Sequence, residues 1–107
     1  MFNGMEEICG ANASQPGNVQ KIRRRYQLCN EKGLHARAAT QFVRTASQFD
    51  STISVYRDEA KADGKSVMSL LILAVPCGSA VDVEAEGTDA ETAVSSLGKL
   101  IESGFGE

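Results

Sequence analysis

The feature that most constrains the fold is a strict alternation of apolar and acidic residues over Val81–Glu86. Valine or alanine stands at each odd position, and aspartate or glutamate stands at each even position. Successive side chains of a β-strand point to opposite faces of its sheet, so this segment predicts a strand with one face in the core and one in water. Such strands favour an antiparallel sheet with helices packed on its apolar face.

Weaker patterns predict three further strands. Apolar residues share one parity over residues 21–28, interrupted by Arg24, and again over residues 51–57. Both segments therefore have the pattern of half-buried strands. A turn over residues 58–61 then leads into a short third strand that ends near Gly64.

Three segments have the composition and spacing of helices. Apolar residues recur at i, i+3, i+4 and i+7 over residues 35–49, which is typical of an amphipathic helix. Ser66 is a good N-cap for a short helix over residues 67–73. The tetrapeptide Thr-Asp-Ala-Glu at 88–91 fits a capping box at the start of the last helix.

The resulting order is β-α-β-β-α-β-α, which predicts an α+β fold with a four-stranded antiparallel sheet covered on one face by three helices. A chain of 107 residues, 42% of them hydrophobic, is large enough for one core. Residues 1–20 are rich in Gly, Asn, Ser and Gln and have no sustained periodicity, so we expect a flexible leader there. Residues 21–107 are expected to form the single domain.

Composition argues against several classes of function. A net charge of −3 disfavours a nucleic-acid partner, which needs many basic contacts to phosphates. Cys9, Cys29 and Cys77 form no C-x-x-C pair, so we expect neither a disulfide framework nor a metal site. No apolar run reaches the roughly 20 residues that cross a bilayer, and the first residues lack the features of a signal peptide. We therefore expect a cytoplasmic protein with no membrane partner, and the absence of a nucleotide-binding motif predicts no cofactor.

The candidate functional residue is His35, the single histidine, in the segment Gly33-Leu34-His35-Ala36-Arg37. A neutral imidazole can act as a nucleophile near neutral pH because its unperturbed pKa is roughly 6.5. A helix N-terminus would stabilise a phosphoryl group on that ring, and Arg37 could pair with the phosphoryl oxygens. An isolated histidine at a helix start can equally be an unreactive cap or surface residue. The residue types alone leave both interpretations open.

The segment Gly33-Leu34-His35-Ala36-Arg37-Ala38 resembles the active-site segment of the HPr family, the histidine-containing phosphocarriers of the bacterial phosphoenolpyruvate-dependent phosphotransferase system. The resemblance includes Lys65–Leu71 and Val81–Gly87, and it implies the open-faced β-sandwich of that family. It also implies that phosphorylated enzyme I donates a phosphoryl group to Nδ1 of His35, that Arg37 neutralises its charge, and that a IIA-type protein accepts it. A phosphoryl carrier of this kind is not a turnover enzyme on a small molecule, and we expect a monomer.

Two features bear on the place of the chain within that family. Ala38 stands where many members carry proline, so the helix start is less rigidly preset and the rate of phosphoryl transfer is in question. The tail Ser103–Glu107 and the stretch Leu70–Ala74 resemble the nitrogen-related (NPr) branch. In that branch the relay regulates metabolism without sugar import.

The second helix holds the other residues that the resemblance singles out. Ser66 matches the serine that an ATP-dependent HPr kinase/phosphorylase modifies in many relatives. This match supports an alternative function, a regulatory interaction module controlled by phosphorylation of Ser66. Val67, Met68 and Leu71 resemble the apolar residues that dock on enzyme I and IIA proteins, with Met68 expected to be exposed. The remaining leucines of this helix are expected in the core.

Overall fold

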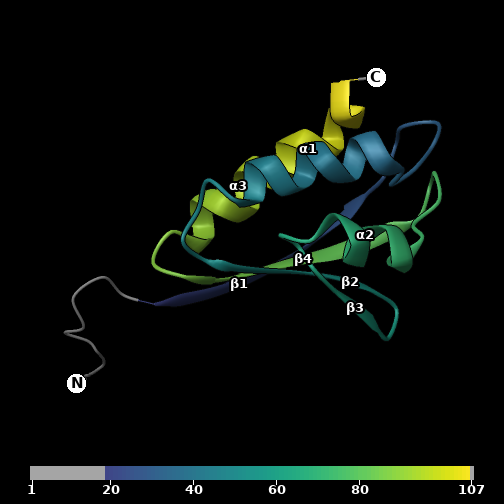
Figure 1. The fold of residues 1–107 in the computed structure, drawn as a ribbon. Coiled ribbons are helices and arrows are strands. Elements are labelled where there is room, and N and C mark those ends of the chain that lie inside the picture. Colours follow the sequence, from purple (N-terminus) through teal and green to yellow (C-terminus); the bar gives the residue numbers. More distant parts are fainter. Residues whose placement is uncertain (1–18, 107) are drawn as a thin grey trace, which may run out of the picture.

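The computed structural model describes residues 19–106 and shows a four-stranded antiparallel sheet with three helices on one face (Figure 1). The element order β-α-β-β-α-β-α and the α+β class are those that the sequence predicts. The elements are β1 (Gln20–Gln27), α1 (Ala36–Ala46), β2 (Thr52–Arg57), β3 (Ala60–Asp63), α2 (Val67–Leu73), β4 (Ala80–Gly87), α3 (Ala90–Glu102) and the 3₁₀ turn η1 (Gly104–Gly106).

The strand with strict alternation lies inside the sheet. The strand order is β1-β4-β2-β3, so β4 bonds to β1 on one side and to β2 on the other. Val83 stands opposite Arg24 of β1 and opposite Val55 of β2. Val81, Val83 and Ala85 are all buried, as the apolar parity of this strand predicts.

Arg24, which interrupts the apolar parity of β1, belongs to the edge of the helix-covered face. Its Nη2 donates to the Glu91 carboxylate of α3 at 2.7 Å. The inner face of β1 is therefore only partly apolar, because an ion pair closes the sheet edge where α3 begins. The strand begins at Gln20, one residue earlier than the periodicity predicts, and Gln20 pairs with Gly87.

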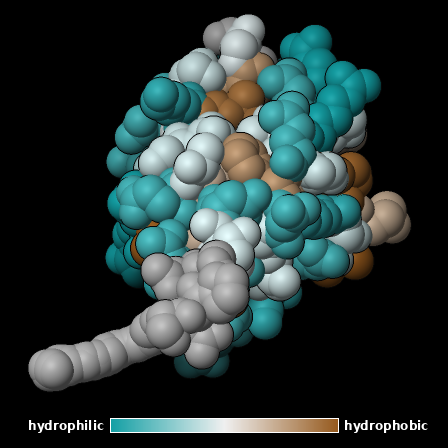
Figure 2. Space-filling view, turned by 90° about the vertical axis from the view of Figure 1, so that its left-hand side faces the viewer, coloured by the Kyte–Doolittle hydropathy of each residue, from teal (hydrophilic) through white to brown (hydrophobic). Residues whose placement is uncertain are grey.

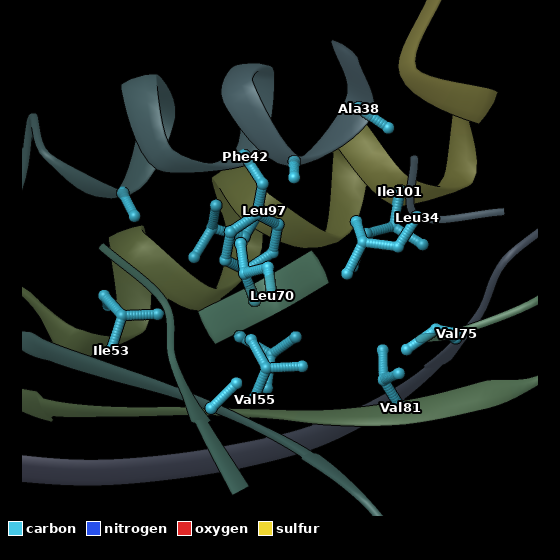
Figure 3. Packing of buried hydrophobic residues seen from close by; sticks show 14 of the residues in the cluster. Leu34, Ala38, Phe42, Ile53, Val55, Leu70, Val75, Val81, Leu97 and Ile101 are labelled. Carbon is cyan, nitrogen blue, oxygen red and sulfur yellow. The ribbon is translucent and has the colours of Figure 1, made fainter. Parts of the chain in front are cut away.

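The helices and the sheet enclose a single apolar layer. Phe42 of α1, Leu70 of α2 and Leu97 of α3 point toward Val55 and the rest of the sheet (Figure 3). In the space-filling view the outer surface is mainly hydrophilic, with hydrophobic side chains visible only in small areas (Figure 2). Full burial of each large apolar side chain contributes about 1.5–3 kcal/mol, so this layer supplies most of the drive to fold.

The other face of the sheet is polar and carries an ion-pair cluster. Asp82 accepts from Arg25 at 2.9 Å and from Arg23 at 3.0 Å. The Arg25 guanidinium, assisted by that of Arg23, holds the pKa of the Asp82 carboxyl below its usual value. The Arg23 guanidinium also lies over the Tyr56 ring, 4.1 Å from its centroid. The acidic side chains of β4 thus lie on the solvent-facing side of the sheet, and arginines of β1 neutralise part of their charge.

The capping box expected at residues 88–91 does not form. Asp89 is the N-cap of α3, but its side chain makes no capping bond to that helix. The Asp89 carboxylate instead accepts from the Ser51 hydroxyl and from the N–H groups of Asp50 at 2.9 Å and Ser51 at 3.0 Å. Ser51 and these N–H groups lower the pKa of Asp89. The carboxylate therefore ties the start of β2 to the start of α3.

Two further expectations concern the N-terminal leader and the membrane. The predicted leader lies outside the described residues, apart from Val19 and Gln20. Among residues 19–106 there is no helix with both the length and the apolar character needed to span a bilayer.

We expect Asp89→Asn to lower the free energy of unfolding at about pH 6 much more than at about pH 2.5. The folded-state pKa of Asp89 lies below the ordinary value of 3.8, so its contribution is complete above that value and is lost as the pH falls through the folded-state pKa. Urea unfolding followed by circular dichroism at the two pH values measures the difference.

Thr88→Ala serves as the control, because it removes the hydroxyl that a capping box would use. It should change stability by less than about 0.5 kcal/mol at both pH values. A difference between wild type and Asp89→Asn that stays constant with pH would show that the charge of Asp89 contributes nothing.

Candidate functional site

The loop that carries His35 is fixed against the segment that follows α2. The Leu34 N–H donates to the Val75 carbonyl at 2.8 Å. Gly33 has a φ of +66°, and a Cβ atom there would lie 2.3 Å from that same carbonyl oxygen. Only glycine meets both requirements, because L-residues rarely adopt positive φ and a side chain would collide with backbone. Gly33 is therefore needed for the close approach of the two segments.

A local turn over residues 30–33 also fixes the conformation of this loop. The buried Asn30 donates through Nδ2 to the Gly33 carbonyl at 2.6 Å, and the Gly33 N–H donates to the Asn30 carbonyl at 3.2 Å. The His35 N–H donates to the Gly33 carbonyl at 3.0 Å. The backbone just before His35 is thus hydrogen-bonded both to Asn30 and to Val75.

His35 is the N-cap of α1, with extended backbone (φ −86°, ψ −178°). Its Nδ1 accepts the Arg37 N–H at 3.3 Å, a bond that requires an unprotonated Nδ1. The imidazole is half-buried, which leaves it accessible to another protein. The structure therefore aims the lone pair of one ring nitrogen at the start of a helix.

The first turn of α1 suits an anion. The first hydrogen bond of the helix runs from the Ala39 N–H to the His35 carbonyl at 2.8 Å, so the N–H groups of Ala36, Arg37 and Ala38 precede the hydrogen-bond ladder of the helix. The first turn contains no acidic residue, and Arg37 is exposed beside it. Backbone donors, the helix dipole and one guanidinium would all favour negative charge on the imidazole.

Ser66 lies at the opposite end of α2 from the His35 loop. It is the N-cap of that helix, and its Oγ accepts the Ser69 N–H at 3.2 Å. Val75, which holds the His35 loop, comes after the C-terminal end of the same helix. A seven-residue helix is about 10 Å long, so the length of α2 separates Ser66 from the segment that supports the His35 loop.

The outer side of α2 is apolar and open. Met68 is 67% exposed, and Val67 and Leu71 are half-buried, whereas Leu70 and Leu73 are buried. Ile72, which the sequence analysis does not single out, is 78% exposed. The spacing contains the signal for it, because Ile72 follows Met68 by four residues and shares its side of the helix.

Neither a metal site nor a disulfide is present in the described part of the chain. Residues 19–106 contain no group of three or more His, Cys, Asp or Glu side chains placed to hold a metal ion. Cys29 and Cys77 are exposed free thiols. The residues around His35 thus supply hydrogen-bond donors, one cation and one nucleophilic nitrogen.

A family model described as "PTS HPr component phosphorylation site" matches residues 22–103. The chain belongs to the HPr family. HPr of Neisseria meningitidis is 38% identical over 86 residues, covering 80% of this chain and 97% of the relative. NPr of Shewanella violacea is 38% identical over 89 residues, covering 83% and 98%.

Solved structures agree with this assignment. An HPr structure from Thermoanaerobacter tengcongensis superposes with a TM-score of 0.78 at 45% identity, covering 80% of this chain and 97% of that one. Both curated relatives are phosphocarrier proteins. Membership of the HPr family places the chain in phosphoryl transfer within the phosphotransferase system.

We expect Gly33→Ala to destabilise the fold by about 2–4 kcal/mol, because strain at positive φ adds to a collision with the Val75 carbonyl. Urea unfolding measures this loss. Gly78→Ala is a matched control: Gly78 also has positive φ (+85°), but nothing lies within 4 Å of its missing Cβ atom.

The control should show the strain alone, about 1–2 kcal/mol. Equal losses for the two variants would show that the close approach of Gly33 to Val75 contributes nothing beyond backbone strain.

Proposed function

We propose that His35 accepts a phosphoryl group on Nδ1 from phosphorylated enzyme I and passes it to a IIA-type protein. The observation that carries this proposal is the hydrogen bond from the Arg37 N–H to Nδ1 of His35, which directs that nitrogen at the first turn of α1. The Nδ1 lone pair attacks phosphorus, a phosphorus–nitrogen bond forms, and the bond to the donor breaks. An acceptor that attacks phosphorus in turn releases the imidazole unchanged, because it is a good leaving group.

The backbone around His35 can change partners during this step. In the free form the Arg37 N–H is bonded to Nδ1. Once Nδ1 is bonded to phosphorus, that lone pair is no longer available and the same N–H can donate to a phosphoryl oxygen. The N–H groups of Ala36 and Ala38 and the Arg37 guanidinium would share the added charge.

Ala38 gives this chain one donor that proline would lack. Its side chain is fully buried, so it stabilises the helix start by packing as well. Proline would preset the backbone but remove the N–H. We therefore attribute to Ala38 a helix start that is less rigid and has one more group for phosphoryl oxygens.

The docking surface we propose for both partners comprises Val67, Met68 and Leu71, to which we add Ile72. Exposed apolar side chains on one side of a helix mark an interface with another protein. The surface lies on α2, and Val75, two residues after the end of that helix, supports the His35 loop. A protein bound there would reach the imidazole, and a monomer would leave the surface open.

We also assign the chain to the nitrogen-related branch, in which the relay is regulatory. This assignment rests on Leu70–Ala74 and on the tail after Ser103. Phe105 of that tail is buried, and Gly104 lies beside Cys29 and Asn30, so the tail packs against the turn before His35. Glu107 lies outside the described residues.

A second function, regulation through Ser66, is supported by its position at the start of the docking helix. Its hydroxyl caps α2 and lies two residues before the exposed Met68. A phosphate placed there by an HPr kinase/phosphorylase would put negative charge beside the docking surface. It would then repel a partner with an acidic surface.

We expect incubation of the wild-type chain with phosphoenolpyruvate and its cognate enzyme I to yield one acid-labile, base-stable phosphate, and His35→Ala to yield none. The reason is that Nδ1 is the acceptor atom. Mass spectrometry and acid and base treatment of the labelled protein measure this outcome.

Arg44→Ala is the control, because it changes α1 at its last turn and leaves the first turn intact. It should be phosphorylated at close to the wild-type rate. An unphosphorylated wild type would falsify the carrier function. If biological output survived in His35→Ala and were lost in a Ser66 variant, the regulatory module would be favoured instead.

We expect Ser66→Asp to raise the KM for enzyme I about tenfold while kcat changes little, since added negative charge weakens docking more than chemistry. Steady-state transfer kinetics measure both constants. Ser66→Ala is the matched control: it removes the N-cap bond and should cost about 1 kcal/mol of stability without raising KM. Equal KM values for the two variants would leave Ser66 with only its capping role.

A further inference from the structure

The C-terminal end of α2 has an unusual requirement for support. The C-cap residue Ala74 adopts the left-handed conformation (φ +55°, ψ +61°), where glycine is the usual residue. The last turn of α2 contains no basic side chain to interact with its carbonyl groups. The carbonyls at this end of the helix therefore need donors from water or from another element.

Arg57, the last residue of β2, supplies that support. Its Nη1 donates to the Ala74 carbonyl at 2.7 Å and to the Leu73 carbonyl at 3.3 Å. The side chain is half-buried, so its position is restricted by packing. A cation at a helix C-terminus also interacts favourably with the helix dipole.

The segment that Arg57 holds is the one on which the His35 loop rests. Val75 follows Ala74 directly, is buried, and accepts the Leu34 N–H at 2.8 Å. Gly33 lies so close to the Val75 carbonyl that no side chain fits between them. A displacement of residues 73–75 would therefore move Leu34, and with it the backbone of His35.

We propose that Arg57 is a positioning residue for phosphoryl transfer at His35. It acts through the carbonyls at the end of α2 and the Val75–Leu34 hydrogen bond, and it touches neither the imidazole nor its phosphoryl group. This role rests on the proposed function of His35. A displacement of about 1 Å at a reacting group can lower the rate by orders of magnitude. A residue that does not touch the imidazole can therefore change the rate of phosphoryl transfer by shifting the backbone of His35.

The chain offers a matched control in Arg25. Arg25 lines the same hollow as Arg57, but its guanidinium donates to Asp82 of β4 and not to the carbonyls at the end of α2. Arg25→Gln and Arg57→Gln each remove one positive charge beside the same hollow. They differ in whether the end of α2 loses its donor.

The experiment compares Arg57→Gln, Arg57→Lys and Arg25→Gln in two measurements. Hydrogen exchange by NMR should show the Leu34 N–H exchanging about tenfold faster in Arg57→Gln, the loss expected for a hydrogen bond from a charged donor, while the N–H of Val83 in the central strand keeps its wild-type rate. Transfer kinetics should show kcat for phosphorylation of His35 falling about tenfold in Arg57→Gln, with a KM for enzyme I within about twofold of wild type.

The conservative and control variants decide the interpretation. Arg57→Lys keeps a cationic donor and should recover part of kcat, and Arg25→Gln should match the wild type in both measurements. Equal acceleration of exchange at Leu34 and Val83 would indicate general destabilisation and overturn the positioning role, as would an unchanged kcat in Arg57→Gln. A wild type that takes no phosphate on His35 would overturn the proposed function itself, while the exchange of the Leu34 N–H would still report whether Arg57 holds the loop.

Discussion

The single apolar face of the sheet determines where the other parts of the molecule lie. All three helices pack on that face because only there can their own apolar sides be buried away from water. Because β1 and β4 are antiparallel neighbours, the connections after β1 and before β4 emerge at the same end of the sheet, where Gln27 and Ala80 are paired. The two connections then bond to each other through Leu34 and Val75. The position of His35 thus follows from the antiparallel pairing of β1 with β4 together with the one-sided core.

Different residues of the short helix α2 serve three different purposes. Leu70 and Leu73 face the core and anchor the helix to the sheet. Met68 and Ile72 face outward and form an apolar surface that the core does not use. The carbonyls at its end face Arg57 and continue into the segment that supports the His35 loop. A helix this short has little stability of its own in water, so each of these contacts depends on the fold around it.

Local patterns predict the elements and the candidate nucleophile, but not the contacts between distant residues. The alternation of residues 81–86 identifies β4, and the glycine, histidine and arginine of residues 33–37 identify a helix start suited to phosphoryl chemistry. The capping box at residues 88–91 is wrong because Asp89, not Thr88, is the N-cap, and the Asp89 carboxylate accepts from Asp50 and Ser51, which are distant in the chain. The bond of Arg57 to Ala74 is equally invisible, since nothing in either local segment indicates that the two meet.

A chain with net negative charge can still carry a phosphoryl group because local charge, not net charge, sets the potential at the imidazole. The Debye length is about 8 Å at physiological ionic strength, so exposed charges farther away act weakly. The acidic residues of β4 lie on the polar face of the sheet, on the side away from α1, and Asp82 is paired with two arginines there. The first turn of α1 has no acidic residue, and Arg37 lies within it. The one-sided fold therefore separates the acidic strand from the histidine, and the donors at the helix start act on it with little opposition.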